Sequence, residues 1–477
     1  MKKILHIIAI AVAAVAALTG LNSCIEDGFT TSEADQPVFA VDTLDLGEVF
    51  TEEPTMVHRF VVYNRAKKSI SISRIAVSGE NAGLFRLNVD GFGAEEFHDV
   101  EIRGEDSIFV FVDANLPSNG TMEPVKVTAS LDFTTNGVTR SVVLAATGVD
   151  AHRLQAEVLT EDTHFVADRP YIVYDSLVVS PDCRLTLDAG VKLCFHDGAY
   201  MAVRGTLEAD GTVEQPVTLC GDRMGNVAAD IPYDLMSNQW LGLFFTHTSH
   251  DSRLTNTVVK NTIQGVTIDG EATEAGEAPM VTLLNCRLRN SGTYALLSFH
   301  GGVKAVGCEF AEAGAGVVYL EGGSHTFNHC TFANYYLFTA IGGPILQFAH
   351  LSATLDDDGT GLPYTRADFT NSIIYGLGSD ISHGDLEGTA VTFSRCLFKS
   401  EGTDDANFIN CLWGADPLYY TVREDYYFDY RLMPDSPAIG AADPALTLPE
   451  AATDGYGLAR GAAPDLGAYV YQPQAQQ

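Results

Sequence analysis

The sequence predicts an all-β protein, with an N-terminal β-sandwich followed by a right-handed parallel β-helix. Two observations carry this prediction. Residues 37–150 alternate strand-like runs with turn residues at short intervals, a spacing typical of a sandwich. Residues 281–334 repeat one apolar pattern with a fixed period, which is typical of a solenoid in which each repeat forms one coil.

Three cysteines define the period of the solenoid. Cys286, Cys308 and Cys330 follow one another at intervals of 22 residues, each with an apolar residue two positions after it and another three positions before it. A spacing of two is that of a β-strand, and the intervening Gly- and Asn-rich segments suit corners better than helical turns. Three short strands of about 3–5 residues fill such a coil. The usual handedness of parallel connections makes the helix right-handed.

The same frame continues on both sides of this stretch, with insertions. The cysteine position is taken by Thr257 upstream and by Ser372 and Cys396 downstream. Asn and Gly tolerate left-handed backbone and are frequent just before this position, so we expect a corner there. The residues at this corner are Asn256, Asn285, Gly307, His329, Asn371 and Arg395. A second corner is expected four residues after the cysteine position, at Asn261, Asn290, Glu312, Asn334, Gly376 and Ser400.

Length and charge limit the classes of function. The 477 residues are too many for one ordinary core, and a hydrophobic content of 46% indicates a folded rather than a disordered chain. The formal net charge of −34 argues against nucleic acid as a partner and against adsorption to anionic lipid. Two interpretations of the acidity stay open, a solvated acidic surface and a site for divalent cations.

Residues 1–23 have the pattern of a cleaved targeting segment. Two lysines precede an apolar, alanine-rich run, which ends in Leu-Asn-Ser-Cys at positions 21–24. This tetrapeptide resembles a bacterial lipobox. The resemblance implies a diacylglyceryl thioether on Cys24, cleavage before that residue, and acylation of the new N-terminus with a chain such as palmitate. The alternative is an ordinary signal peptide followed by an incidental cysteine.

The residues after Cys24 bear on where the protein is anchored. Several acyl chains hold a protein stably, so the resemblance implies attachment to a membrane. Glu26 and Asp27 resemble the acidic surface-export signal of Bacteroidota lipoproteins, and Ile25 is not the aspartate that marks inner-membrane retention. We therefore expect a monomeric, lipid-anchored outer-membrane protein that faces the cell exterior. Residues 24–36 are polar and acidic and form the expected tether.

The strand-like segment after the tether has its own resemblance. Its runs LDLGEV, FVVYN, DSIFVFV and VVLAATG resemble the immunoglobulin-like modules related to the ASH family. Such modules are spacers or protein-binding units, and residues 37–150 contain no recognisable catalytic constellation. The resemblance therefore implies a spacer or a protein-binding role for this part of the chain.

Further resemblances extend to the end of the chain. Residues 185–222 resemble the opening coils of bacterial β-helices, and Trp240 with Gly242 matches their W-x-G element. Residues 407–477, with SPAIG and DLGAY, resemble the terminal module of choice-of-anchor-type proteins, with Tyr419 where that pattern usually has phenylalanine. The resemblance implies a Bacteroidota surface lipoprotein, from a family that does not imply one biochemical role. Its last segment is expected to cover the open end of the helix.

These patterns divide the chain into five expected parts. They are a signal peptide (1–23), a lipidated acidic tether (24–36), an immunoglobulin-like β-sandwich (37–150), a parallel β-helix (151–432) and a C-terminal capping segment (433–477). Within the helix, VKLC at 191–194 and VTLC at 217–220 are expected to be equivalent strands on successive coils.

Eight cysteines follow Cys24, and two interpretations of them stay open. An exported protein with an even number of cysteines can form disulfides, and stacked positions about 4.8 Å apart lie within the Cα range of a bridge. Parallel stacking points the Cβ vectors the same way, however, which favours buried thiols that pack as small hydrophobes. No CxxC pair occurs, so we expect no zinc site of that kind.

Enzymes on this fold, such as pectate lyases, chondroitinase-B-like lyases and polygalacturonases, indicate what catalysis would need. A lyase needs a Lys or Arg base, often beside Ca²⁺, and a hydrolase needs a pair of carboxylates. Lys304 and Arg287 are candidate neighbours on adjacent coils, and Asp356, Asp357 and Asp358 are candidate Ca²⁺ ligands. A solvated charged surface is the alternative for each group. We therefore assign no catalytic residue, cofactor or metal ligand.

Three hypotheses of function follow. His325 and His329 are expected to be stacked or surface residues, and a group of aromatic residues suits either a sugar-stacking platform or cap packing: Tyr419, Tyr420, Tyr426, Tyr427, Phe428 and Tyr430. The leading hypothesis is a non-catalytic module that binds a polysaccharide or a surface protein along the solenoid. A polysaccharide lyase or glycoside hydrolase is the second, and a structural envelope protein is the third, because fold alone does not fix function.

Overall fold

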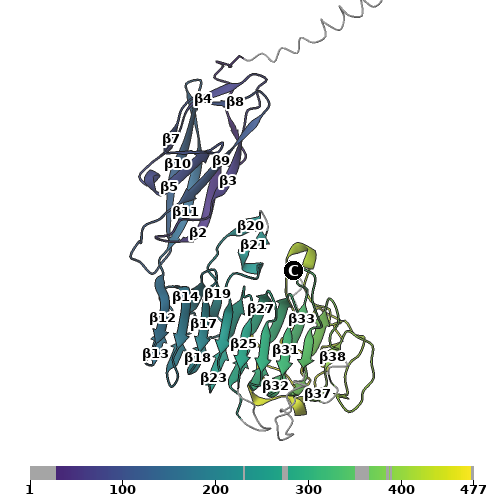
Figure 1. Ribbon diagram of the computed structural model, residues 1–477. Coiled ribbons are helices and arrows are strands. Elements are labelled where there is room, and N and C mark those ends of the chain that lie inside the picture. The colour runs from purple at the N-terminus through teal and green to yellow at the C-terminus, as the bar shows by residue number, and fades with distance from the viewer. Residues whose placement is uncertain are drawn as a thin grey trace, which may run out of the picture. The chain divides into compact units, whose positions relative to one another are not determined.

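The computed structural model describes residues 28–228, 231–270, 278–349, 365–382, 386 and 389–473 (Figure 1). Their regular elements are β-strands and short 3₁₀ helices, so the all-β prediction is confirmed. The chain divides into two compact units, Met1–Asp150 and Ala151–Gln477. The expected signal peptide and Cys24 lie outside the described residues. No helix in the described part of the chain is long and apolar enough to cross a membrane.

The first unit is a sandwich of two β-sheets. One sheet has the order β1, β3, β9, β5 and β6, with bounds Val38–Phe39, His58–Tyr63, Ser107–Ala114, Phe85–Val89 and Phe92–Ala94. The other has the order β2, β11, β10, β4 and β7, with β8 also paired to β4; their bounds are Thr43–Phe50, Val138–Val149, Val125–Thr135, Ile70–Ser78, Glu96–Phe97 and Val100–Ile102. Alternate residues point inward, as Ile108, Val110 and Val112 do in β9, and they form one core. The immunoglobulin-like resemblance of this unit stays a prediction.

The second unit is a parallel β-helix whose coils contribute strands to three faces. β14 (Tyr171–Val179) pairs through its first residues with β16 and through its last residues with β17, so the longest sheet bends into two faces at this strand. We call these face A and face B, and we call the separate ten-stranded sheet face C. Strands of successive coils pair in parallel and in register within each face (Figure 1).

The strands of each face have the following bounds. Face A consists of β16 (Lys192–Phe195), β19 (Val217–Gly221), β24 (Thr257–Lys260), β27 (Arg287–Ser291), β30 (Glu309–Ala313), β33 (Thr331–Asn334), β36 (Ile373–Gly376) and β38 (Leu397–Phe398). Face B consists of β17 (Tyr200–Val203), β22 (Gly242–Phe245), β25 (Val266–Asp269), β28 (Leu296–Phe299), β31 (Val318–Glu321) and β34 (Leu346–Ala349). Face C consists of β13 (Thr163–Phe165), β15 (Arg184–Leu187), β18 (Thr206–Asp210), β23 (Ser252–Thr255), β26 (Val281–Leu284), β29 (Val303–Val306), β32 (Ser324–Asn328), β35 (Arg366–Thr370), β37 (Ala390–Ser394) and β39 (Phe408–Ile409). The remaining strands are β12 (His152–Leu159), which pairs with β14, and the inserted hairpin β20 (Asn226–Ala228) and β21 (Ile231–Pro232).

The predicted corner before the cysteine position is confirmed. It joins face C to face A, and all six residues expected there have positive φ, from 41° at Asn256 to 67° at Gly307. The second corner is only partly as predicted. Three of its residues have positive φ, namely Asn261, Asn290 and Glu312, whereas Asn334, Gly376 and Ser400 do not. At Asn334 and Gly376 the chain is still in the extended conformation of β33 and β36, of which they are the last residues.

Stacked apolar side chains fill the interior of the coils. The rings of Phe310 and Phe332 stack with their centroids 5.1 Å apart, and those of Phe327 and Phe369 stack at 4.6 Å. Trp240 is fully buried, and its indole N–H donates to the carbonyl of Lys260 at 2.8 Å, which supplies the partner that a buried indole needs. The interior is therefore close-packed from one coil to the next.

The cysteines of the described residues are all free thiols. Cys286 is fully buried, and its thiol donates to the carbonyl of Leu254 in the preceding coil at 3.3 Å. Cys308 and Cys330 make equivalent bonds, as the buried-thiol interpretation expects. Cys194 and Cys220 pair in register on face A with their sulfur atoms 4.0 Å apart, so VKLC and VTLC are equivalent strands.

Residues 415–473, which we call the C-terminal segment, lie along the side of the solenoid rather than over its end. The segment packs on Ala311 and Ala333 of face A, whose small side chains leave room for it. The last coil is covered instead by Trp413, whose ring stacks on Phe398 at 4.9 Å. The regular elements of the C-terminal segment are η4 (Arg423–Asp425), η5 (Pro444–Leu446) and η6 (Pro449–Ala451).

Candidate ligand-binding site

Corner residues of the coils hold the C-terminal segment in place. Asn371, which forms one left-handed corner, donates through Nδ2 to the carbonyl of Asp443 at 2.9 Å and accepts from the amide of Asp443 at 2.8 Å. His329, at the equivalent corner of the preceding coil, places Nε2 2.9 Å from Oγ1 of Thr447. These bonds satisfy buried polar groups of both the coils and the C-terminal segment, and they fix residues 443–447 against the coils.

A buried charged cluster holds the segment where it crosses face A. Arg289 on β27 forms an ion pair with Glu309 on β30, and the second oxygen of Glu309 accepts from the hydroxyl of Tyr469 at 2.6 Å. Glu312 accepts from the hydroxyl of Tyr430. Burial raises the pKa of Glu312 to about 8; the charge of Arg289 opposes this rise and that of Glu309 adds to it. Glu312 is therefore largely protonated at neutral pH.

The turn that presents Tyr456 is built around one buried carboxylate. Asp454 Oδ1 accepts from the amides of Tyr456 and Leu458, both at 2.9 Å, and Oδ2 accepts from the amide of Val470 at 2.8 Å. Three backbone donors on one carboxylate define the conformation of the turn. Tyr456 is 43% exposed, so the turn presents an aromatic ring to solvent from a fixed base.

Tyr456 also forms one wall of a groove in the C-terminal segment. The groove has a volume of about 560 Å³ and is lined by Tyr420, Arg431, Leu432, Tyr456, Leu458, Val470, Gln472 and Pro473. The guanidinium of Arg431 lies 5.4 Å from the centre of the Tyr456 ring, and its Nε donates to Oδ1 of Asp429 at 3.0 Å. Burial would raise the pKa of Asp429, but hydrogen bonds from Arg431 lower it below the usual value. Two tyrosine rings and a few fixed polar groups thus share one concave surface.

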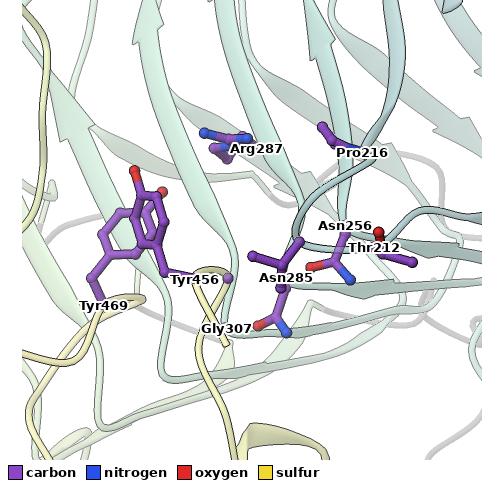
Figure 2. Close-up of a pocket in the computed structure, with 10 residues that line it drawn as sticks. Thr212, Pro216, Asn256, Asn285, Arg287, Gly307, Tyr456 and Tyr469 are labelled. Carbon is purple, nitrogen blue, oxygen red and sulfur yellow. The ribbon is translucent and has the colours of Figure 1, made fainter. Parts of the chain in front are cut away.

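A second and much smaller recess is lined by Tyr456 as well (Figure 2). Its volume is about 10 Å³, which holds about one water molecule. Arg287 lies beside the rings of Tyr456 and Tyr469 in this view. The Oδ1 atoms of two further lining residues, Asn256 and Asn285, are buried and have no hydrogen-bond partner among the described residues. The recess therefore admits one small polar group and not a whole ring.

The structure does not bring the two predicted cations together on one face. Arg287 begins β27 of face A, whereas Lys304 lies on β29 of face C and pairs with Glu450. The two residues are separated by less than one 22-residue period, so they occupy different faces of the solenoid. The candidate Ca²⁺ ligands at 356–358 lie outside the described residues.

The two histidines are packed side chains. Burial lowers the pKa of His325 to about 4 and that of His329 to about 3, so both are neutral near pH 7. Nε2 of His325 lies 2.9 Å from the carbonyl oxygen of Gly322, which gives the buried ring one partner. Neither histidine lines the groove or the recess.

The predicted aromatic group divides between the two roles that the sequence left open. Tyr419 and Tyr430 are buried in the core that joins the segment to face A, whereas Tyr420 lines the groove. The sequence interpretation missed Tyr456 and Arg431. The signal for Tyr456 is its place between two glycines in the tetrapeptide at 454–457, a composition typical of an exposed turn.

Two other surfaces carry aromatic or charged side chains. On face B, the ring of Tyr319 lies 5.5 Å from that of Tyr294 and 5.7 Å from that of Phe299. In the sandwich, a cavity of about 640 Å³ is lined in part by Arg74 and Glu96, which neutralise one another as an ion pair. The face B rings form a strip of tilted aromatic side chains outside the groove, so they are the natural comparison for it.

Within the described ranges, no group of three or more His, Cys, Asp or Glu side chains is placed to hold a metal ion. His247 and His250 have a His-x-x-His spacing, but Nδ1 of His250 lies 3.2 Å from a carboxylate oxygen of Asp251. The spacing therefore gives no metal site by itself.

Comparisons with known proteins add little to this geometry. No family model matches the chain, and no curated protein matches it. Similar solved structures include a family 123 glycoside hydrolase from Clostridium perfringens, 9% identical over 24% of this chain and 26% of that one, with a TM-score of 0.18. A protein of unknown function from Porphyromonas gingivalis W83 is 14% identical over 26% of this chain and 60% of that one, with a TM-score of 0.18.

A third similar structure covers more of the chain. The catalytic unit of a GH87 α-1,3-glucanase from Streptomyces thermodiastaticus is 9% identical over 71% of this chain and 79% of that one, with a TM-score of 0.18. The chain spans about a quarter and about three fifths of the lengths of the first two structures. At these TM-scores none of the likenesses indicates a function for this chain.

Proposed function

We propose that the protein is a lipid-anchored surface protein that binds a glycan, without cleaving it, in the groove beside Tyr456. One observation carries the proposal. An exposed tyrosine, on a turn fixed by Asp454, forms the wall of a groove of about 560 Å³. Pockets of about 300–1,000 Å³ with a few placed polar groups are typical of ligand sites. Because the turn is already ordered, little conformational entropy is lost when a ligand binds.

The chemistry of the groove suits a sugar. A pyranose ring has an apolar face of C–H groups that packs on an aromatic ring, and its hydroxyls need donors and acceptors at the edge of that ring. Tyr420 and Tyr456 supply aromatic surface, and Arg431 and Gln472 supply polar groups. Asp429 holds the Arg431 guanidinium in place, so its remaining donors are oriented before a ligand arrives.

The position of the carboxylates favours binding over hydrolysis. A glycosidase needs two carboxyl groups on either side of the scissile bond. Glu309 and Glu312 are buried beneath the C-terminal segment and do not line the groove. The alternative is a polysaccharide lyase that uses Arg287 as its base, since Arg287 lies next to Tyr456.

The test is to mix the full-length protein with neutral and uronic-acid polysaccharides, with and without Ca²⁺, and to follow polymer size by gel filtration. We expect co-elution of protein and polymer without shortening of the polymer. Shortening of any polymer would contradict the binding function and favour a lyase or a hydrolase. Absence of co-elution with every polymer would contradict glycan binding and move the search to surface proteins.

Two variants locate the binding surface. Tyr456→Ala should abolish co-elution, because it removes the exposed ring from the groove. Tyr319→Ala, which removes a ring from the strip on face B, should leave co-elution unchanged. The reverse result would place the glycan along the solenoid face instead of in the groove.

We also propose that acylated Cys24 anchors the chain in the outer membrane, with the sandwich as a spacer. The lipobox-like residues 21–24 support this proposal. Cys24→Ala should abolish incorporation of labelled palmitate, and protease added to intact cells should degrade the wild-type protein. Palmitate incorporation by the variant, or full protection of the wild type, would contradict the anchor or its outward orientation respectively.

A further inference from the structure

The recess beside the groove holds a cation, although the chain as a whole is strongly acidic. The formal net charge is −34, yet Arg287 pairs with its neighbours only through its backbone, and its guanidinium makes no hydrogen bond or ion pair with another described residue. Its in-register neighbour on the next coil is Glu309, which is already paired with Arg289 and bonded to Tyr469. One guanidinium is therefore left without a counter-charge beside the glycan groove.

The neighbouring acid does not neutralise it. Glu312 is the other carboxyl group on β30, and its pKa of about 8 keeps it largely protonated at neutral pH. Glu309 and Arg289 cancel one another, so the positive charge of Arg287 is unbalanced within this part of face A. A cation that lacks a partner in a strongly acidic protein fits an anionic ligand better than a neutral one.

The size of the recess defines which part of the ligand reaches Arg287. A volume of about 10 Å³ excludes a sugar ring and admits about one oxygen atom of a substituent. Tyr456 is common to the recess and the groove, so a ring that packs on Tyr456 can extend a substituent toward Arg287. The buried Oδ1 atoms of Asn256 and Asn285 supply acceptors for a hydroxyl or a water molecule at the same place.

We infer that the ligand is an acidic saccharide whose carboxylate or sulfate group binds Arg287 while its ring packs on Tyr456. This inference rests on the proposed function, because the same groove holds the ring. A guanidinium donates charge-assisted hydrogen bonds to a carboxylate or a sulfate oxygen, which gives orientation as well as charge. Arg431 is already paired with Asp429, so Arg287 is the residue that distinguishes acidic from neutral sugars.

The experiment measures the affinity of the full-length protein for two matched pairs of polymers by titration calorimetry. One pair is polygalacturonate and its carboxyl-reduced form, and the other is a sulfated galactan and its desulfated form. The wild type should bind the acidic member of one pair at least tenfold more tightly. Which pair shows the difference identifies carboxylate or sulfate as the anionic group.

Variants of Arg287 connect that difference to the recess. Arg287→Gln should weaken binding of the acidic polymer by about ten- to a hundredfold and leave the neutral polymer unchanged. Arg287→Lys, which keeps the charge, should restore part of the affinity. Arg204→Gln is the matched control, since Arg204 is exposed at a corner between faces B and C and the substitution changes the net charge equally.

The outcomes separate the inference from the proposed function. Equal affinity for both members of each pair, unaffected by Arg287→Gln but lost in Tyr456→Ala, would overturn the inference and leave glycan binding intact. Failure of every polymer to bind the wild type would overturn both. Equal weakening by Arg287→Gln and Arg204→Gln would show that net charge, and not the recess, selects the ligand, which also overturns the inference.

Discussion

The coils of the β-helix and the C-terminal segment that lies against them are held together in different ways. In the coils, residues one period apart pair in register, as Val281, Val303 and His325 do on face C. The segment has only isolated bridges between its own residues, and side-chain bonds such as those of Asn371 attach it to the coils. Repetition thus supplies stability, while the irregular segment supplies the groove.

This difference indicates where each kind of substitution should act. Backbone ladders and stacked rings in neighbouring coils support one another, so damage inside a coil should lower the stability of the whole unit. The segment is held by one small apolar core on face A and by individual polar contacts, without a continuous backbone ladder, so damage there should loosen one region or change ligand binding. The following predictions test that division, from the largest expected effect to the smallest.

Phe310→Ala should have the largest effect on stability. Phe310 is fully buried and stacks on Phe332 in the next coil, so its loss should lower the free energy of unfolding by about 3–5 kcal/mol. Phe299→Ala, a partly exposed position on face B, should lower it by less than about 1 kcal/mol. Urea unfolding followed by circular dichroism measures both. Similar losses of unfolding free energy in the two variants would contradict an interior stabilised by rings that stack from coil to coil.

Glu312→Gln should remove a pH dependence of the folding stability that arises where the C-terminal segment packs on face A. Burial raises the pKa of Glu312 from 4.5 to about 8 in the folded protein. The folded state then binds more protons, so stability is fully present below about pH 4.5 and declines as pH rises through 8. Without any rearrangement the decline would be about 5 kcal/mol, and local rearrangement that relieves part of the burial penalty reduces it to about 3 kcal/mol.

The glutamine variant stays neutral and still offers Tyr430 an acceptor, so its stability should exceed that of the wild type by more at pH 9 than at pH 5. Thermal unfolding at a series of pH values measures the difference. The two proteins share all other titratable groups. Curves of stability against pH that run parallel would therefore show that Glu312 is not buried as described.

His329→Asn should flatten the acidic limb of the stability curve. Burial lowers the pKa of His329 from 6.5 to about 3, so the folded state binds fewer protons and stability falls as pH drops below about 6.5. We expect the wild type to lose about 3 kcal/mol between pH 7 and 4 from this residue. Asparagine tolerates left-handed backbone, as Asn371 does one coil later, so the corner should keep its shape. Unchanged acid sensitivity of unfolding in the variant would argue against a buried neutral imidazole.

Asn410→Ala should have the smallest of these effects. Asn410 is an exposed corner residue with φ of 52°, and alanine is strained there by about 1 kcal/mol. Asn410→Gly relieves that strain and should leave stability within about 0.5 kcal/mol of the wild type. Chemical denaturation of the three proteins compares them. A larger loss in the glycine variant than in the alanine variant would mean that the backbone does not set the preference at this corner.

The coils could be predicted from the sequence because each depends on local features that repeat. The 22-residue spacing of Cys286, Cys308 and Cys330 defined the strands, and Asn, Gly or His before each one defined the corner. The expected proximity of Lys304 to Arg287 is wrong in detail, because residues less than one period apart lie on different faces of the coil, Arg287 on face A and Lys304 on face C.

The groove could not be predicted in the same way. Glu309 and Glu312 stand on a strand whose outer side would ordinarily face water, and only the return of the segment over face A buries them. Whether Tyr419 or Tyr420 is buried depends on side-chain contacts made far along the chain, which no local pattern encodes. The exposed ring of Tyr456 depends on Asp454, a single residue without a repeat to reveal it.

The most direct test of this account compares Tyr456→Ala with Tyr319→Ala, measuring both the affinity for a glycan that co-elutes with the wild type and the midpoint of thermal unfolding. The account predicts that Tyr456→Ala abolishes binding and leaves the unfolding midpoint close to that of the wild type, while Tyr319→Ala retains binding. Retained binding in Tyr456→Ala, with loss in Tyr319→Ala, would contradict it and assign the ligand surface to the coils.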